Sequence, residues 1–177
     1  AGDYVYITGT LYVARDAAHK RMMEVLDEGK ELPFNIQDQT IFYVGPTPSK
    51  PGQVFGSGGP TTSGRMDAYS PRLIKLGLHA MIGKGYRSDA VKKAIVDYHG
   101  VYFGAIGGAG AMMSSCIEEC EVIAFDDLGP EAIRKLKVKN KNHSLLSTIC
   151  GEDSVSFFRL KMEIYFRKSS RKVSKAS

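Results

Sequence analysis

At 177 residues the chain has the size of one domain, large enough to bury most of an ordinary core without disulfide or metal staples. Hydrophobic residues make up 43% and charged residues 24%, and these globular values exclude intrinsically disordered and fibrous proteins. The net charge of +5 could suit a nucleic-acid binder, but much of the excess lies in a Ser-rich terminal run. We therefore expect one domain over residues 1–166, a basic, disordered tail over 167–177, and no nucleic-acid partner.

The first half of the chain alternates strand and helix patterns. Residues 3–10 alternate side chains as a strand does, residues 14–28 place apolar groups on one helical face, and residues 40–44 form a second strand. A loop rich in Gly, Pro, Ser and Thr follows over residues 45–63. Loops of more than about 12 to 15 residues are uncommon in compact domains and are usually functional, so this loop is a candidate site.

The second half continues the alternation, and it predicts an α/β architecture with a mixed sheet and no internal repeat. Ser70 is a candidate helix N-cap, with Pro71 as the first helical residue. Residues 140–152 have no strong periodicity. The other expected elements are helices at 70–76, 88–100 and 109–117 and strands at 79–82, 101–106, 121–125 and 158–166.

The end of the long loop combines glycines, hydroxyls and one arginine in the run Gly-Pro-Thr-Thr-Ser-Gly-Arg-Met-Asp at residues 59–67. Glycines let backbone amides approach an anion, and Arg65 adds a planar fork of donors that fits a carboxylate. The run therefore predicts an anion pocket. An ordinary turn with an exposed arginine fits the composition equally well.

Two more cations follow predicted strands. Arg15 lies between the first strand and the first helix, where ligands collect in α/β sheets, although most arginines in such a place are surface residues. Lys84 lies between two glycines directly after the strand at 79–82, where a ligand contact and a solvated turn fit equally well. Neither this segment nor the Gly-rich residues 107–110 match a phosphate loop or a dinucleotide motif.

Metal-binding patterns are lacking in the sequence. The four histidines are scattered without metal-site spacing. Cys116 and Cys120 are expected on one helical face, but two thiolates cannot complete an iron-sulfur cluster, and with Cys150 they form no CxxC pair. We therefore expect reduced thiols and no metal held by this chain. With no apolar run long enough to span a bilayer and no signal-peptide pattern, we also expect a cytoplasmic protein without a membrane segment.

With these residues identified, the sequence resembles the β subunit, or C-terminal domain, of class I fumarases and the related L-tartrate dehydratases. The motifs that carry the resemblance occur in the family's order over about three quarters of the chain. They are Arg-Asp-Ala-Ala-His-Lys-Arg at 15–21, Tyr-Val-Gly-Pro at 43–46, the run at 59–67, Gly-Lys-Gly at 83–85, Val-Tyr-Phe at 101–103, Gly-Gly-Ala at 107–109 and Glu-Ala-Ile at 131–133.

The resemblance implies a swivelling β/β/α domain whose substrate is a small dicarboxylate. It also implies that Arg15, Arg65 and Lys84 bind the substrate carboxylates, that Thr61 is the catalytic base, and that Thr62 is its competitor for that role. The four-iron, four-sulfur cluster of the family is held by an α subunit or N-terminal domain, which implies an α2β2 assembly active only with that partner.

The implied reaction is reversible hydration of fumarate to malate, a hydro-lyase reaction. L-Tartrate dehydration and a stand-alone dicarboxylate-binding module are the alternatives. After Lys139 the sequence departs from the family, which continues with a strand beginning Phe-Pro, whereas this chain reads Asn-Lys-Asn-His-Ser-Leu at 140–145. The departure concerns the terminal strand and the fit to a partner, and it leaves the expected site residues unchanged.

Overall fold

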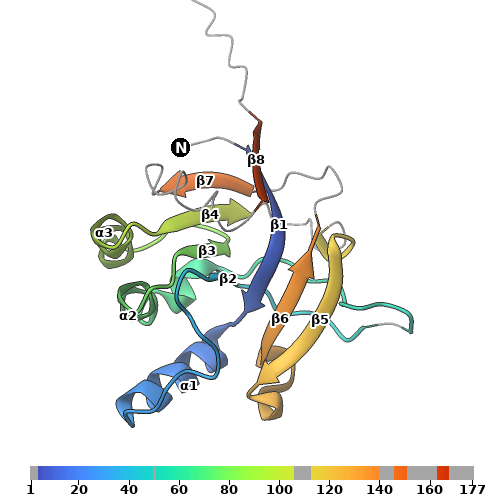
Figure 1. Ribbon diagram of the computed structural model, residues 1–177, viewed down its shortest axis with the longest axis horizontal. Coiled ribbons are helices and arrows are strands. Elements are labelled where there is room, and N and C mark those ends of the chain that lie inside the picture. The colour runs from blue at the N-terminus through green and yellow to red at the C-terminus, as the bar shows by residue number, and fades with distance from the viewer. Residues whose placement is uncertain (1–3, 50, 106–112, 140–145, 151–162, 168–177) are drawn as a thin grey trace, which may run out of the picture.

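The computed structural model describes residues 4–49, 51–105, 113–139, 146–150 and 163–167 (Figure 1). Strands and helices alternate through the first two thirds of the chain, as the sequence predicts. The strands are β1 (Tyr4–Val13), β2 (Thr40–Phe42), β3 (Ala80–Gly83), β4 (Val101–Ala105), β5 (Ile117–Ala124), β6 (Ile133–Val138), β7 (Leu146–Cys150) and β8 (Glu163–Arg167). The helices are α1 (Asp16–Asp27), α2 (Ser70–Lys75) and α3 (Asp89–Asp97), with short 3-10 helices η1 (Ser63–Met66) and η2 (Asp126–Glu131).

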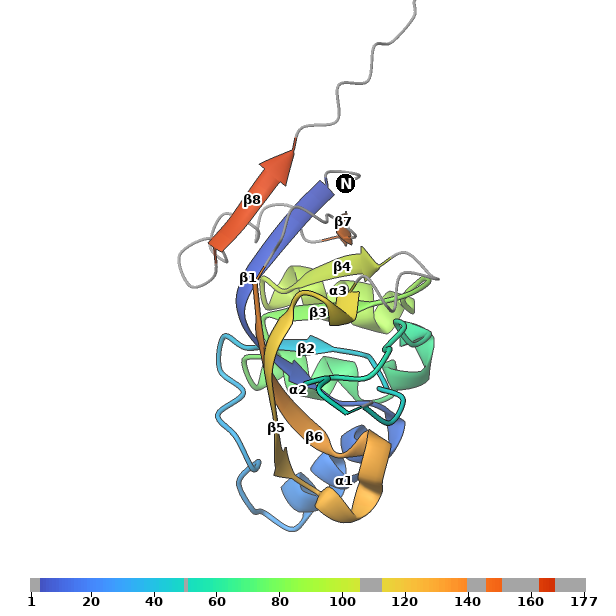
Figure 2. The same ribbon diagram turned by 90° about the vertical axis from the view of Figure 1, so that its right-hand side faces the viewer.

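One mixed sheet joins all the described strands, and β1 is its hub. β1 pairs in parallel with β2 and antiparallel with β6, β7 and β8. β2, β3 and β4 are parallel neighbours, and β4 pairs antiparallel with β7. The pairings from β1 through β2, β3, β4 and β7 back to β1 therefore form a closed ring, with β5 attached beyond β6. Figure 2 shows β2, β3 and β4 stacked one above another, with β5 and β6 running across them.

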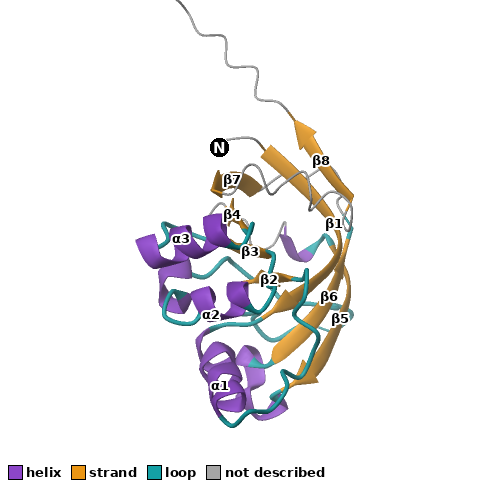
Figure 3. Cartoon of the chain, turned by 60° about the vertical axis from the view of Figure 1, so that its left-hand side comes forward, coloured by secondary structure: helices purple, strands orange, loops and turns teal. Residues whose placement is uncertain are grey.

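The side chains of the central strands alternate between two buried cores. Phe42, Ile82 and Phe103 point into a core shared with β1 and β6, whereas Met81 and Tyr102 point into a core shared with the helices. All five are at most 3% exposed. These strands are buried on both faces and therefore carry apolar side chains on both faces. Figure 3 shows the resulting layers, with helices, then β2 to β4, then β1, β5 and β6. The predicted α/β class with a mixed sheet is confirmed, and its layers have the β/β/α order.

The parallel pairing of β1, β2 and β3 determines where the expected site residues lie. Because these strands run in the same direction, their carboxyl ends meet at one edge of the sheet. Arg15 follows β1, the long loop follows β2, and Lys84 follows β3 directly. Three segments that are far apart in the sequence are thereby brought to one place.

Several predicted elements need correction. Ser70 is not an N-cap: Tyr69 holds that position, and the Ser70 hydroxyl donates to the Met66 carbonyl instead. The helix expected at 109–117 is wrong at its end, because Ile117 begins β5; Cys120 therefore lies in a strand and shares no helical face with Cys116. β6 and β7 were not predicted, although Leu136 and Val138 alternate with lysines in β6; β7 has no clear apolar alternation.

Other predictions are confirmed or lie outside the described residues. Ser88 is the N-cap of α3, and its hydroxyl accepts from the Val91 amide. The Gly-rich run at 107–110, the first part of the strand expected at 158–166, and the tail beyond residue 167 fall outside the described residues. Within the described parts of the chain, no helix combines the length and apolar character that crossing a bilayer requires.

Candidate active site at the ends of three parallel strands

A backbone interlock joins the run at 59–67 to the loop after β3. The Thr61 amide donates to the Tyr43 carbonyl at 2.7 Å, and the Lys84 amide donates to the Thr61 carbonyl at 3.1 Å. The Ser63 amide in turn donates to the Lys84 carbonyl at 2.8 Å, and Thr62 forms a parallel bridge with Lys84. Three of the expected site residues, Thr61, Thr62 and Lys84, are therefore held side by side.

Arg65 links this interlock to the start of α1. It lies in η1, and its Nη2 is 2.8 Å from Oδ2 of Asp16, the first residue of α1. The Arg65 side chain is 52% exposed and the Asp16 side chain 26% exposed. Water screens an ion pair at such exposure, and Oδ2 of Asp16 accepts no hydrogen bond, so the contact adds little to the stability of the fold. Arg65 therefore keeps N–H groups available to a ligand.

Arg15 is the most enclosed of the three cations. Its Nη2 lies 3.2 Å from Oε1 of Glu131, whose other oxygen accepts from the Ala17 amide at 2.8 Å. Glu131 thus caps α1 from another part of the chain, since Arg15 at the N-cap position makes no side-chain cap bond. The Arg15 side chain is 21% exposed, and its Nε is buried without a hydrogen-bond partner.

Gly45 makes room for the Arg15 side chain. A Cβ at position 45 would lie 1.8 Å from Nη1 and 2.9 Å from Cζ of Arg15. No side chain larger than hydrogen fits there while Arg15 keeps its position. The glycine that opens the long loop therefore allows the guanidinium to lie directly against the backbone.

His19 supports Arg15 from one turn further along α1. The imidazole is fully buried, and its Nδ1 donates to the Arg15 carbonyl at 2.8 Å, which leaves Nε2 buried and without a hydrogen-bond partner. Burial disfavours the imidazolium and lowers the pKa of His19 from 6.5 to about 4. At neutral pH the ring is uncharged, packed edge-on against Tyr43 with the ring centroids 5.4 Å apart.

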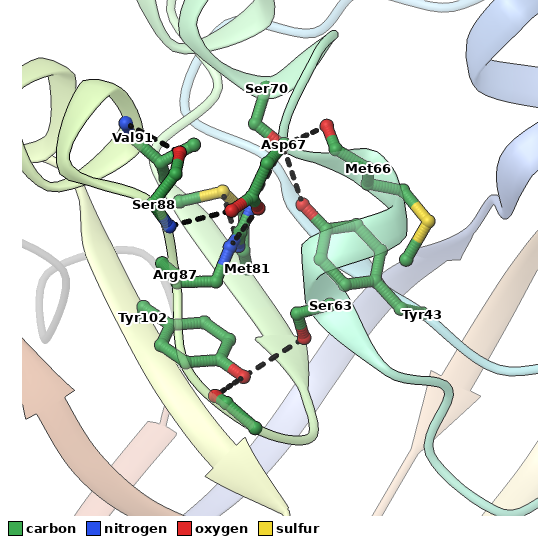
Figure 4. Close-up of polar contacts among 11 residues, drawn as sticks. Tyr43, Ser63, Met66, Asp67, Ser70, Met81, Arg87, Ser88, Val91 and Tyr102 are labelled. Carbon is green, nitrogen blue, oxygen red and sulfur yellow. Dashed lines mark hydrogen bonds and ion pairs between the residues drawn. The ribbon is translucent and has the colours of Figure 1, made fainter.

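A buried polar cluster lies beneath these residues (Figure 4). Its centre is Arg87, whose side chain is 1% exposed and whose Nε donates to Oδ1 of Asp67 at 2.7 Å. Its guanidinium carbon lies 5.3 Å from the ring centre of Tyr43 and 5.0 Å from that of Tyr102. Burial disfavours the cation, but the interactions with Tyr43 and Asp67 outweigh it, so the pKa of Arg87 is raised.

Sequence reasoning found the exposed cations and missed the groups that support them. Asp67 ends the run at 59–67, and Arg87 follows Gly-Lys-Gly-Tyr at 83–86, so both adjoin motifs already singled out. An acidic and a basic residue next to two loops that are candidates for ligand binding could have suggested a link between those loops. Glu131 lies in the motif at 131–133, but its residue type and spacing indicated no partner, because its partners are more than a hundred residues away in the sequence.

The exposed chemistry of the site is cationic and hydroxylic. Thr61 is half-buried, whereas Thr62, Arg65 and Lys84 are exposed. Together with Arg15 they place three cations and two hydroxyls on one edge of the sheet, with Arg15 paired to Glu131 and Arg65 paired to Asp16. Guanidinium groups keep further N–H donors when one is paired, so the arrangement can bind a carboxylate anion. Among the described residues, no three His, Cys, Asp or Glu side chains come together in a way that could hold a metal ion.

Comparison with known proteins identifies the family of the chain. The family model described as "Fumarase C-terminus" matches residues 1–156. The chain is 43% identical over 149 residues to "Fumarate hydratase class I, anaerobic" of Escherichia coli, covering 83% of this chain and 27% of that protein. It is 42% identical over 136 residues to "Fumarate hydratase 1, mitochondrial" of Leishmania major, covering 76% of this chain and 25% of that protein.

A third relative is shorter. The chain is 38% identical over 144 residues to "Putative L(+)-tartrate dehydratase subunit beta" of Methanocaldococcus jannaschii, covering 78% of this chain and 74% of that protein. The chain thus spans about a quarter of the length of the two fumarate hydratases but most of this β subunit. Because the family model matches most of the residues of the chain, the chain belongs to the fumarase C-terminus family.

Proposed function

We propose that this chain is the substrate-binding β subunit of a hydro-lyase that catalyses the reversible hydration of fumarate to (S)-malate. One observation carries the proposal. Arg15, Arg65 and Lys84 are gathered with Thr61 and Thr62 where β1, β2 and β3 end, through the interlock at Lys84 and the Asp16 contact. A dicarboxylate needs cations for both of its ends, and this edge of the sheet supplies three.

The reaction explains why these residue types are useful. Malate gives up a proton from the carbon next to one carboxylate and hydroxide from the neighbouring carbon, and the two leave as water. Negative charge grows on that carboxylate as the proton is removed. Cations fixed before the reaction stabilise this charge more in the transition state than in the ground state. We assign this role to Arg15, Arg65 and Lys84.

Thr61 is the proposed base that takes the proton from malate and returns it during hydration. A threonine hydroxyl is a poor base at its free pKa and needs positive charge nearby. The hydrogen bond from the Lys84 amide to the Thr61 carbonyl keeps these two residues adjacent, and this supports the assignment. Thr62 lies beside the same lysine, so it is the competing candidate.

The proposed assembly places the cluster elsewhere. The resemblance implies a four-iron, four-sulfur cluster held by a partner. Among the described residues no set of side chains could hold a metal ion, and we assign the cluster to an α subunit. Lys84 and Arg65 are exposed in this chain. Charge stabilisation is strong only where water is excluded, so a partner covering this edge would complete the site. We propose an α2β2 complex in the cytoplasm.

L-Tartrate dehydration is the second candidate. The observation in its favour is that this chain covers most of a protein named as a putative L(+)-tartrate dehydratase β subunit. Tartrate presents the same two carboxylates and one more hydroxyl. Anaerobic mixing of this chain with a reconstituted α subunit, followed by assays on malate and L-tartrate, separates the two. Turnover of neither substrate by a complex with an intact cluster would contradict the enzyme proposal.

A binding module without catalysis is the remaining alternative. Calorimetry on the full chain, with fumarate as the ligand, distinguishes it from the enzyme half. Binding by the chain alone with no turnover in any complex would favour the module. Binding only in the presence of the α subunit would favour an active site shared between the two.

A further inference from the structure

The buried cluster around Arg87 does not face a ligand. Three of its donors are used within the protein: Nε donates to Asp67, Nη2 to the Ser70 hydroxyl at 2.7 Å, and Nη1 to Sδ of Met81 at 3.4 Å. A buried charge is costly unless it is paired and hydrogen-bonded, and here it is both. The 1% exposure of the side chain excludes direct contact with a dicarboxylate at the surface. The role of Arg87 therefore lies in the segments of the chain that its contacts hold together.

One hydroxyl of the cluster connects the two segments that carry the site. Tyr102 Oη lies 2.9 Å from the Gly85 carbonyl and 2.9 Å from Oγ of Ser63 (Figure 4). A carbonyl only accepts, so the single phenolic proton goes to Gly85, and Ser63 must donate to the Tyr102 oxygen. Ser63 and Gly85 flank the interlock formed by Thr61 and Lys84. The tyrosine hydroxyl therefore bridges the two segments of the interlock, the run at 59–67 and the loop after β3.

A second connection lies further along both segments. Asp67 accepts from Nε of Arg87 with one oxygen and from the Ser88 amide at 2.6 Å with the other. Asp67 closes the run at 59–67, and Ser88 is the N-cap of α3. Both ends of the segment from Gly85 to Ser88 are thus attached to the run that carries Thr61 and Arg65.

The protons of the cluster follow a single consistent order. The Ser70 hydroxyl donates to the Met66 carbonyl at 2.9 Å and accepts from Arg87, so the Tyr43 hydroxyl, 3.2 Å away, donates to it. Tyr43 also provides the carbonyl that receives the Thr61 amide. A buried network in which each nitrogen and oxygen of the side chains has a partner favours one arrangement of the segments it joins.

From these contacts we infer that Tyr102 and Arg87 are positioning residues that hold Lys84 and Thr61 in register. This inference rests on the proposed function for its catalytic consequence, but the mechanical link is a property of the described residues alone. Arg87 orients the ring of Tyr102 by lying over it, and the Tyr102 hydroxyl holds the two segments together. A misplacement of about 1 Å at reacting groups can cost about a hundredfold in rate.

The test removes one oxygen atom. Tyr102→Phe keeps the ring under Arg87 but deletes the bridge between Ser63 and Gly85. The control is Tyr98→Phe, which removes a hydroxyl from a tyrosine that is 46% exposed at the end of α3. Hydrogen exchange is measured on the full chain for the amides of Ser63 and Lys84, because it requires no activity. We expect exchange at both to rise at least fivefold in Tyr102→Phe and to stay unchanged in the control.

The kinetic arm uses the complex with the α subunit. We expect Tyr102→Phe to lower kcat for fumarate hydration at least tenfold with less than a twofold change in KM, since the cations remain but the proton-transfer geometry loosens. Ser63→Ala removes one of the two hydrogen bonds of the Tyr102 hydroxyl and should also lower kcat. The double variant should be no worse than Tyr102→Phe alone, because Tyr102→Phe already removes the bond that Ser63→Ala breaks.

Each outcome is decisive for the link. Unchanged exchange in Tyr102→Phe, or faster exchange without any change in kcat of an active complex, would overturn the positioning role. If the wild-type complex turns over no dicarboxylate while exchange rises as expected, the proposed function fails and the link between the segments stands.

Discussion

Replacement of Gly45 by alanine tests the placement of Arg15 with one added methyl group. A Cβ at this position would be 1.8 Å from Nη1, 2.9 Å from Cζ and 3.1 Å from Cδ of Arg15. Carbon and nitrogen atoms in contact are about 3.5 Å apart, so the guanidinium must withdraw by about 1.5 to 2 Å. Such a movement also breaks its 3.2 Å contact with Glu131. The substitution therefore displaces the guanidinium without removing its charge.

The expected cost falls on substrate binding and not on folding. A charge-assisted hydrogen bond is worth about 1.5 to 3 kcal/mol, so losing the Arg15 contact should lower kcat/KM by a factor of about 10 to 150. The obstacle is the end of a flexible side chain, and Gly45 has no positive φ, so the free energy of unfolding should change by less than about 1 kcal/mol.

The assay is hydration of fumarate by the complex with the α subunit, combined with chemical denaturation of the variant chain. Gly100→Ala is the matched control, because a Cβ there makes only ordinary contacts at 3.4 Å or more and its φ is not positive either. It should leave kcat/KM within about twofold of the wild type, since no atom has to move. An unchanged kcat/KM in folded Gly45→Ala would show that Arg15 does not hold the substrate from this position.

Three further predictions concern single side chains. Arg65→Lys should lower kcat/KM at least tenfold, because a lysine cannot reproduce the planar fork, worth about 1.5 to 3 kcal/mol for one contact; unchanged kinetics in a folded variant would remove Arg65 from the pocket. Thr61→Ala should lower kcat by about a hundredfold or more with a small change in KM, as expected for loss of a base, and Thr62→Ala should have a smaller effect; the reverse order would assign the base to Thr62. The folded pKa of His19, about 4, lies below its ordinary 6.5, so the unfolded chain binds the proton first and the free energy of unfolding should fall as pH decreases from 6.5 to 4. The loss should total about 3 kcal/mol and disappear in His19→Phe, as measured by denaturation at several pH values, and identical pH slopes in both proteins would contradict the burial account.

The parts of the site that follow strongly patterned strands were predictable from the sequence. β2 and β3 are short apolar runs buried on both faces, so the residues after them, including Lys84, could be placed at a sheet edge. Arg15 was predictable in the same way, since it lies between an alternating strand and an amphipathic helix. The interlock between Thr61 and Lys84 was not, because it is made by backbone atoms and leaves no trace in residue types.

Long-range polar contacts account for the other differences. Ser70 reads as an N-cap, yet its hydroxyl is taken by Met66 and Arg87, which only the folded arrangement brings near. Local propensity was overridden by pairing at residue 117, where small side chains suggested a helix but β6 offers a partner strand. Glu131 was invisible as a cap of α1, because capping groups are recognisable in sequence only when they adjoin the helix.

In the function proposed above, this chain contributes the substrate-binding residues and the base to a hydro-lyase that requires a cluster-bearing partner. The most direct measurement is fumarate hydration in deuterium oxide, under anaerobic conditions, by the chain combined with its α subunit. We expect malate with one deuterium on the carbon that does not carry the hydroxyl, formed only when both subunits are present. Malate formation at the same rate by the α subunit alone, or no malate from a complex whose cluster is intact, would contradict it.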